Sequence, residues 1–301
     1  MALTHRALHY PNDFWPARDF LASLYPLRSA GSVWDVRRWD GSIHHSEVSG
    51  LDAGRAARSR LWVTEGGRIV AAAMSEGGSQ IHPHVHPEFD HLLAEVIAWS
   101  EATAAAAGDQ RVSLHVWDGD AATRRIAVER GYREGERWEI IRRLRFGTAP
   151  LPPGEIPAGY TMRITRADAA DHQAIADLLN AAFGRTIHRA AELANFTAFA
   201  PSFRREVDLV AEAPDGTVAA YAAVCWDSCN RRGIFEPVGT HPEHRQRGLA
   251  RALMLEGMRR ARDLGAVVID VGTGDMDPAN ALYESLPFAE VHRGRFWVKT
   301  L

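Results

Sequence analysis

Residues 234–265 decide the fold, and they read IFEPVGTHPEHRQRGLARALMLEGMRRARDLG. An apolar run ends at Gly239-Thr240, a loop rich in histidine and arginine follows, and Gly248 opens a stretch whose apolar residues recur at helical spacing. The start of a helix leaves backbone N–H groups unpaired and carries partial positive charge, so main-chain groups can bind a diphosphate there. The segment therefore predicts a strand, an anion-binding loop and a helix.

The residue types in this loop suit an anion. Gly248 keeps side-chain atoms away from the point where phosphate oxygens would lie, and Ala250 is the next smallest choice. Arg245, Arg247 and Arg251 add positive charge around the same point. We therefore expect a ligand that carries phosphate groups to bind where the helix begins.

The same order of hairpin, helix and strand occurs twice in the chain. Apolar runs at 207–212 and 217–226 flank the turn Pro214-Asp215-Gly216, and runs at 61–64 and 69–74 flank Glu65-Gly66-Gly67 in the same relation. His-Pro-Glu occurs at 86–88 and again 155 residues later, each time before an amphipathic helix. Strands at 112–117 and 267–271 follow, then a short helix, and Trp138 and Trp297 mark the last strand of each copy. The order predicts two copies of one α/β unit.

The boundary between the copies lies in residues 147–159, which read GTAPLPPGEIPAG and hold four prolines and three glycines. We predict a domain over 1–147, a linker over 148–158 and a second domain over 159–301. A helix that connects two strands over this length usually makes them parallel neighbours, so each domain should contain a mixed sheet flanked by helices.

Composition narrows the class of partner. The chain has 301 residues, of which 46% are apolar and 24% charged, as in soluble globular proteins. Thirty-five basic and 38 acidic residues give a net charge of -3, so no basic excess favours a nucleic acid or an anionic membrane. The first residues contain no apolar run typical of a signal peptide or membrane span, and we expect a cytoplasmic protein.

The cysteines and the N-terminal histidines are the possible metal ligands. Cys225 and Cys229 stand four apart and are expected to be two reduced thiols rather than a disulfide or half of a metal site. The alternating histidines of the first copy could point the same way from an extended segment; they are His82, His84, His86 and His91. Since no cysteine and no clear set of carboxylates accompanies them, a pH-sensitive surface or a packed loop is favoured, and no metal is predicted.

The pattern Arg245-x-x-Gly248-x-Ala250, after a strand and before a helix, resembles the acetyl-CoA signature of the GNAT superfamily of N-acetyltransferases. Further features agree, namely Val238-Gly239-Thr240, Asp277-x-x-Asn280-x-x-Tyr283-Glu284 and Phe288. The resemblance covers the whole C-terminal copy, and two such copies resemble tandem GNAT proteins of the mycothiol synthase type. It implies an α/β fold of two tandem GNAT-like domains, each a mixed, mostly antiparallel sheet with a central splayed pair of parallel strands flanked by helices.

The same resemblance implies acetyl-CoA as the acyl donor and no metal. In such enzymes the pantetheine arm enters the gap between the splayed strands. The residues that the resemblance assigns to the donor are Val238, Gly239, Thr240, Arg245, Gln246, Arg247, Gly248, Leu249, Ala250, Arg251 and Asn280. Pro237 indicates independently that pairing is interrupted on this strand, because proline donates no ladder hydrogen bond.

Acyl transfer to a primary amine also needs proton transfer. An alkylammonium with a pKa of about 10.4 is protonated at neutral pH, so a base must remove its proton. Glu236, three residues before Gly239, is the candidate base, with a water chain or a merely solvated glutamate as alternatives. The resemblance makes Tyr283 the general acid for the CoA sulfur, and a packing tyrosine is the alternative.

The N-terminal copy departs from the pattern. Its loop, residues 82–95, reads HPHVHPEFDHLLAE without glycine or arginine, and Arg124 and Ala127 stand where the second copy has Asn280 and Tyr283. We expect this copy to have lost donor binding and to act as a structural partner or as a wall of the acceptor pocket. By family analogy, residues 184–205 should line that pocket, whose acceptor is an amine-bearing small molecule or peptide.

Other readings remain open. Residues 268–274, VIDVGTG, resemble the glycine-rich turn of an S-adenosylmethionine methyltransferase, but only 27 residues follow and such a sheet needs further βα units. A sensor of the same fold that binds acyl-CoA without turnover is a second alternative. The sequence is compatible with a monomer or a homodimer.

Overall fold

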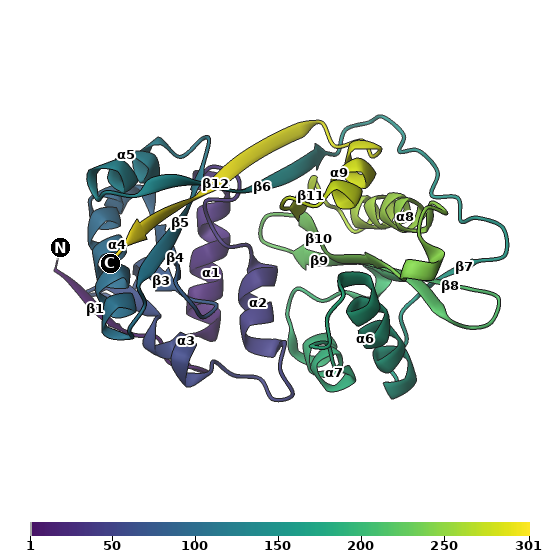
Figure 1. Cartoon of the computed structure of the whole chain (residues 1–301), viewed down its shortest axis with the longest axis horizontal. Helices are drawn as coiled ribbons and strands as arrows, with labels where there is room; N and C mark the ends of the chain where they lie inside the picture. Colours follow the sequence, from purple (N-terminus) through teal and green to yellow (C-terminus); the bar gives the residue numbers. More distant parts are fainter. Residues whose placement is uncertain (1) are drawn as a thin grey trace. The chain divides into compact units, whose positions relative to one another are not determined.

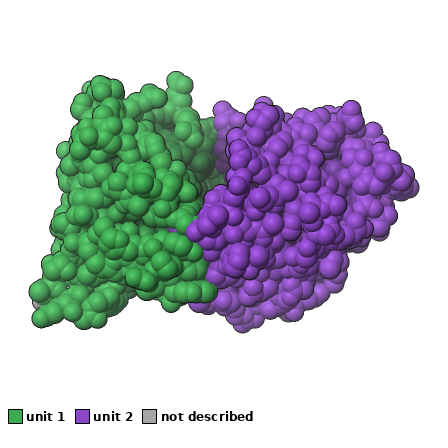
Figure 2. Space-filling view, turned by 90° about the horizontal axis from the view of Figure 1, so that it is seen from below, with its two compact units in different colours: residues 1–42, 50–141, 292–301 green, residues 43–49, 142–291 purple. Residues whose placement is uncertain are grey.

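The computed structural model of the protein describes residues 2–301, and it divides into two compact units (Figure 2). Unit 1 contains the residues up to Ser42, Gly50–Ile141 and His292–Leu301. Unit 2 contains Ile43–Ser49 and Arg142–Val291. Within the described residues, no helix combines the length and the apolar character needed to cross a membrane.

Unit 1 holds a mixed sheet in the strand order β1-β2-β3-β4-β5-β12. Its strands are β1 (Leu3–Ala7), β2 (Arg60–Thr64), β3 (Ile69–Met74), β4 (Gln80–Val85), β5 (Arg111–Trp117) and β12 (Glu290–Thr300). Its helices are α1 (Phe14–Leu24), η1 (Tyr25–Leu27), α2 (Val36–His44), α3 (Ala53–Ala57), η2 (Pro87–Leu92), α4 (Leu93–Ala106) and α5 (Ala121–Glu129). The hairpin β2–β3 forms as predicted, since Glu65-Gly66-Gly67 turns the chain and Gly67 takes a φ of +81°.

The core of unit 1 lies between the sheet and helices α4 and α5. Val96 and Ile97 of α4 are fully buried against Val70 of β3 and Leu114 of β5. Helix α1 lies on the other side of the strands from α4 (Figure 1). Strand β3 is apolar and buried along its whole length, because helices cover both of its faces.

The strands of unit 2 stand in the order β6-β11-β10-β9-β8-β7, and of β6 only Arg142–Arg145 belong to this unit. Its strands are β6 (Arg133–Arg145), β7 (Thr161–Ile164), β8 (Asp208–Glu212), β9 (Val218–Asp227), β10 (Arg232–Thr240) and β11 (Val268–Thr273). Its helices are α6 (Ala169–Phe183), α7 (Ala190–Phe199), η3 (Arg205–Val207), η4 (Pro242–His244), α8 (Leu249–Asp263) and α9 (Asp277–Glu284). The pair β10–β11 is parallel and the pairs β10–β9, β9–β8 and β8–β7 are antiparallel.

Helices cover both faces of the unit 2 sheet, with α6 and α7 on one side and α8 and α9 on the other (Figure 1). Leu253 and Met258 of α8 pack with Phe235, whereas Leu178 and Leu179 of α6 pack with Tyr221 on the opposite face. This architecture confirms the predicted α/β class, with a mixed sheet and flanking helices in each repeat.

The strands that close the repeats do not follow the sequence order. Residues His292–Leu301 belong to unit 1, where β12 runs antiparallel to β5, and Arg142–Arg145 of β6 belong to unit 2. The proline-rich residues 148–158 belong to unit 2, where Leu151 and Ile156 pack against its core. Gly154 lies so close to α8 that an added Cβ would stand 2.6 Å from the carbonyl oxygen of Ala252.

Candidate functional site

The predicted donor site begins where two parallel strands of unit 2 separate. Strands β10 and β11 pair from Arg232 with Val268 to Phe235 with Val271, and their pairing ends there. Strand β10 continues alongside β9, where Val238, Gly239 and Thr240 face Ala222, Tyr221 and Ala220. The register shifts between Phe235 and Val238, which is the interruption that Pro237 predicted. The β11-facing edge of β10 is therefore unpaired at the residues assigned to pantetheine.

The start of α8 has the features of an anion site. Gly248 precedes the helix with a φ of +79°, a backbone conformation that residues with a side chain rarely adopt. An added Cβ at this position would meet no atom within 4 Å. No side chain caps the helix and no acidic residue lies in its first turn. The N–H groups at this end therefore face open space with favourable polarity, and the residues present fit a diphosphate.

The arginines of the loop also tether it. Arg245 donates a hydrogen bond of 2.8 Å to the carbonyl oxygen of Ala182, at the end of α6. Arg247 donates to the hydroxyl of Tyr160 at 2.9 Å and to the carbonyl oxygen of Glu243 at 3.1 Å. Both arginines remain exposed, as does Arg251. The sequence predicted their charge but gave no sign of these contacts.

Three side chains of the same loop could hold a metal ion, which the sequence did not suggest. His241, Glu243 and His244 place possible ligand atoms within 4.8 Å of one another. Two of these groups already have partners, because His241 Nδ1 accepts from the Glu243 N–H at 3.4 Å and His244 Nδ1 lies 2.9 Å from the Tyr160 hydroxyl. These contacts shape the loop without an ion.

The two predicted catalytic residues approach the strand gap from different elements. Glu236 is exposed and directly follows Phe235, the last β10 residue with a partner on β11. Tyr283 lies on α9 and is buried in the core that includes Phe235 and Val271. Burial raises the pKa of Tyr283 to about 12, and the negative charge of Glu236 adds to the rise while Arg142 opposes it. The three side chains are therefore close enough to interact electrostatically.

Arg142 is the residue of this site that the sequence did not reveal. Its side chain is buried and donates to Asn280 Oδ1 at 2.8 Å and to Glu284 at 3.0 Å. Asn280 in turn donates to the carbonyl oxygen of Gly274 at 3.1 Å. Arg142 thus holds the amide of Asn280 and the helix that carries Tyr283.

A buried ion cluster fixes the strands beneath the site. Asp270, in the middle of the apolar strand β11, binds Arg143 through both carboxylate oxygens at 2.7 and 2.8 Å and Arg232 at 2.7 Å. Burial alone would raise the pKa of Asp270, but the two guanidinium groups outweigh it and lower the pKa. An aspartate inside an apolar strand was the signal that arginine partners would be found on neighbouring strands.

The opposite side of β10 carries an aromatic surface. Phe196 of α7 packs with Ile234 of β10 and with Cys225 of β9, so it lies on the face that also bears α6. The ring of His45 stacks on Phe196 with centroids 4.2 Å apart and planes 6° apart. His45 comes from the segment Ile43–Ser49, which belongs to unit 2 and is held by a hydrogen bond from Asn195 to the His44 carbonyl oxygen at 2.9 Å. The sequence did not predict this contribution from the first repeat.

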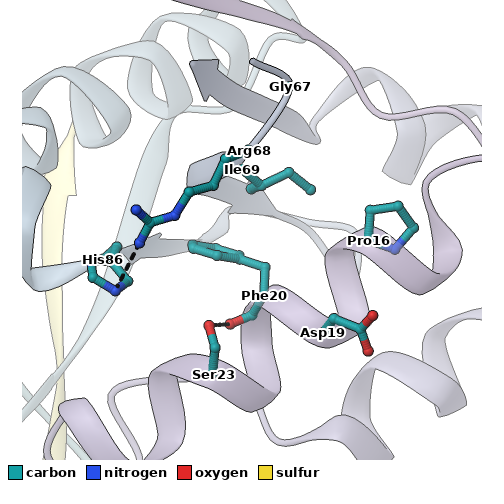
Figure 3. Close-up of a pocket in the computed structure, with 8 residues that line it drawn as sticks. All are labelled: Pro16, Asp19, Phe20, Ser23, Gly67, Arg68, Ile69 and His86. Atoms are coloured by element: carbon teal, nitrogen blue, oxygen red, sulfur yellow. Dashed lines mark hydrogen bonds between the residues drawn. The ribbon is translucent and has the colours of Figure 1, made fainter. Parts of the chain in front are cut away.

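Unit 1 contains a pocket of its own. A cavity of about 260 Å³ lies between α1 and the β2–β3 hairpin, and Phe20, Ile69, Arg68 and His86 are among its lining residues (Figure 3). Arg68 lies 3.3 Å from His86 Nε2 and 3.4 Å from Glu88. None of the predicted site residues lines this pocket.

Comparisons with known proteins agree with this geometry. Residues 173–288 match the model of the acetyltransferase (GNAT) family. No curated protein matches the chain. A tandem GNAT protein from the clavulanic acid biosynthesis pathway, solved without AcCoA, superposes with a TM-score of 0.71 at 16% identity and covers 99% of this chain and 98% of its own. A GCN5-related N-acetyltransferase from Sphaerobacter thermophilus gives 0.68 at 20% identity, with 99% and 95% covered.

A third structure, a GCN5-related N-acetyltransferase from Kribbella flavida, gives a TM-score of 0.53 at 15% identity and covers 76% of this chain and 86% of its own. At these sequence identities the similar structures establish the fold alone. The family is indicated by the match of residues 173–288 to the family model. Because the matched segment contains the strand gap, the Gly248 loop and Tyr283, residues 173–288 form a GNAT acetyltransferase domain within a chain that has the tandem GNAT fold.

Proposed function

We propose that the protein is an N-acetyltransferase that transfers an acetyl group from acetyl-CoA to a primary amine of a small molecule or peptide, by direct attack in a ternary complex. The observation that carries the proposal is the start of α8. There Gly248, with a φ of +79° and open space at its Cβ position, precedes an uncapped helix beside an unpaired stretch of β10.

On this proposal the diphosphate of the donor is held by the N–H groups that begin α8, at Leu249, Ala250 and Arg251. Arg245, Gln246 and Arg247 form the loop around it, and Gln246, with a φ of +60°, helps turn the backbone toward the same point. The β10 edge at Val238, Gly239 and Thr240 offers main-chain groups to the pantetheine amides. Bound in this way, the donor would supply the activated acyl carbon.

Proton transfer is assigned to two side chains. Glu236 is exposed at the end of the paired part of β10, so it can accept a proton from an incoming ammonium directly or through water. Tyr283 holds a proton that can pass to the departing thiolate. Since the pKa of Tyr283 is raised to about 12, mainly by burial, its hydroxyl remains protonated at neutral pH and is available as an acid.

The acceptor is proposed to approach from the face of α6 and α7. Phe196 lies on that face near Ile234, two residues before Glu236, and Phe199 presents a 63% exposed ring at the end of α7. Arg189 contributes positive charge at the start of α7 and pairs with Glu47 at 3.0 Å. These features favour an amine attached to an apolar group.

The test is a turnover assay on the full chain with acetyl-CoA and a panel of primary amines, in which the release of free thiol is measured. The expected result is thiol release that depends on one class of amine and is lost in both Glu236→Gln and Tyr283→Phe, while calorimetry shows that both variants still bind acetyl-CoA. Absence of any heat of binding for CoA thioesters to the intact protein would remove the proposal.

An acyl-CoA sensor remains the second candidate, because the donor-binding features do not depend on Glu236 or Tyr283. Binding of acetyl-CoA without acetylation of any amine would favour it. A methyltransferase is not supported, since the VIDVGTG segment lies inside the matched acetyltransferase segment as β11. Cys225 and Cys229 form no disulfide, which is compatible with the proposed cytoplasmic location. The protein is proposed to be a monomer or a homodimer.

A further inference from the structure

The alternating histidines of the first repeat line a small buried cavity in unit 1. His82 and His84 lie on β4 and His115 lies on β5, and all three border a cavity of about 30 Å³ together with Trp34 and Arg38. Strands β4 and β5 pair in parallel at Gln80–Ile81 with Ser113–Leu114, and these side chains follow the point where that pairing ends. The cavity lies outside the donor site of unit 2.

The cavity is lined by polar nitrogen atoms that have no partner. His84 is 2% exposed, and neither of its ring nitrogens has a hydrogen bond. Nε2 of His82, Nε2 of His115 and the indole nitrogen of Trp34 are also buried without a partner. His82 and Trp34 are 6% and 4% exposed. Buried polar groups are nearly always hydrogen-bonded in native proteins, so a cluster of this kind indicates a missing partner.

The rings are held firmly by their neighbours. The Trp34 ring contacts His82 and His84 edge-on, with centroids 4.9 and 5.7 Å away. The His115 ring stacks on Phe296 at 4.3 Å, and Gly294 is packed so closely that an added Cβ would stand 2.6 Å from His115 Nε2. The nitrogen atoms therefore cannot turn toward water without breaking these contacts.

The chemistry of the lining selects the ligand. An indole nitrogen can only donate, as can the guanidinium of Arg38, and a neutral imidazole always keeps one donor. Burial, followed by the charge of Arg38, lowers the pKa of His84 to about 3, so its ring is neutral in the absence of a ligand. The indole of Trp34 and one ring nitrogen of His84 thus require an acceptor. A carboxylate has acceptor oxygens only, whereas an amide would bring donors of its own.

The carboxylates near the cavity already have other hydrogen-bond partners. Arg38 is bound to Glu76 through two hydrogen bonds of 2.7 and 2.5 Å. Asp120 lines the cavity, but its two oxygens accept from the N–H and the hydroxyl of Thr123 at 3.0 and 2.7 Å. Glu139 lies 3.4 Å from Nδ1 of His115, on the other ring nitrogen from the unpaired one. None of these carboxylates is paired with the unpartnered nitrogens of His84 or Trp34.

We propose that this cavity of unit 1 is a binding site for a small carboxylate, whose oxygens accept hydrogen bonds from the indole of Trp34 and from the imidazoles of His82 and His84. A cavity of about 30 Å³ suits a group of this size, because a single water needs only about 10–15 Å³ by the same measure. The site takes the head group of a carboxylic acid.

A metal ion fits the cavity less well than a carboxylate. Within residues 2–301, the three imidazoles do not bring three ligand atoms within 4.8 Å of one another, whereas His241, Glu243 and His244 of the other unit do. The indole of Trp34 and the guanidinium of Arg38 would also direct N–H groups at a cation. Metal binding is therefore the competing outcome that the experiment must distinguish.

The experiment is a titration of the full chain, labelled with ¹⁵N, with sodium acetate at constant ionic strength. Acetate should shift the indole N–H signal of Trp34 and at least one imidazole signal. The shifts should saturate at an acetate concentration of about 10 mM or less, as expected for a dissociation constant of about 1 mM or lower. Acetamide, the neutral molecule of the same shape, should bind at least about tenfold more weakly because it carries donors and no charge.

Variants locate the effect. Trp34→Phe should remove the shifted indole signal and weaken acetate binding about tenfold, and His84→Leu should weaken it similarly while leaving Tm unchanged or higher, since an unpaired buried imidazole does not stabilise the fold. Trp15→Phe, at a 54% exposed indole, is the matched control and should bind acetate as the native chain does. The proposal is overturned if acetate gives no saturable shift, if acetamide binds equally well, or if Zn²⁺ but not acetate perturbs His84.

Discussion

Nη1 of Arg142 lies 2.8 Å from Oδ1 of Asn280, so a residue on the N-terminal side of the proline-rich segment holds the helix that carries Tyr283. The same guanidinium binds Glu284 at 3.0 Å. Arg142 is therefore a positioning residue for the proposed reaction, since it orients α9 and adds a positive charge near Tyr283.

Replacing Arg142 with methionine should lower kcat about tenfold and the free energy of unfolding by about 1.5–3 kcal/mol, the usual loss for hydrogen bonds to a charged group. Without the cation, the pKa of Tyr283 should rise further and the phenol should become a weaker acid. Turnover assays and denaturant unfolding would measure both effects. Arg145→Met, at a 63% exposed arginine paired with Glu290, should change neither. An Arg142→Met variant with native kcat would contradict the positioning role.

Tyr283→Phe and Glu236→Gln should each reduce kcat by about 10²–10⁴-fold, the range that a general acid or base contributes. The affinity for acetyl-CoA should stay within about twofold, because neither residue belongs to the loop proposed to bind the diphosphate. Single-turnover kinetics and calorimetry would separate the two quantities. Loss of CoA binding in Tyr283→Phe would show that the hydroxyl binds the donor rather than transferring a proton.

Gly248→Ala should weaken CoA binding about tenfold, because its Cβ would occupy space where the diphosphate is proposed to lie. Gly216→Ala is the matched control for the backbone strain that any side chain causes at a positive φ. Both glycines have positive φ angles, +79° and +87°, and at both an added Cβ would meet no protein atom within 4 Å. Both variants should therefore lose a similar amount of stability, about 1 kcal/mol. Equal CoA affinity in the two variants would argue against the α8 site.

Asp208 should make the stability of the protein depend on pH. Burial raises its pKa from 3.8 to about 6, although Tyr221 donates a hydrogen bond of 2.7 Å to it and Thr165 donates another. The folded state therefore binds this proton more tightly than the unfolded state. The resulting stabilisation is complete below pH 3.8 and is lost as the pH rises through about 6.

The difference in pKa of Asp208 corresponds to about 3 kcal/mol at most. Unfolding in denaturant at several pH values should show stability falling over this range in the native chain and falling less in Asp208→Asn. The exposed Asp275→Asn serves as the control, and an identical pH dependence in all three proteins would refute the assignment.

The sequence predicted the elements of unit 2 well where local signals were strong. Pro214-Asp215-Gly216 marked the hairpin β8–β9, Pro237 marked the interrupted pairing of β10, and Gly248 marked the start of α8. These features depend on backbone conformation that only a few residue types allow. The α/β class and the tandem fold followed from the repetition of such signals.

The sequence could not predict contacts between residues that are distant in the chain. Arg142 and Asn280 are brought together only by the order of strands in the sheet, and His45 reaches Phe196 because its segment belongs to unit 2. The histidines at 82 and 84 were predicted to lie on a pH-sensitive surface or in a packed loop, but the structure places His82 and His84 in strand β4, where both are buried. Alternation predicted their common direction but not the missing partners of their ring nitrogens.

The placement of β12 has a consequence for how the chain matures. The last ten residues, His292–Leu301, complete the sheet of unit 1, while Arg142–Arg145 of β6 serve unit 2. The first repeat therefore cannot close its sheet until residues 292–301 have been synthesised. Two fragments severed within the proline-rich segment would each lack a strand, so they should regain solubility only when co-expressed and able to complement each other.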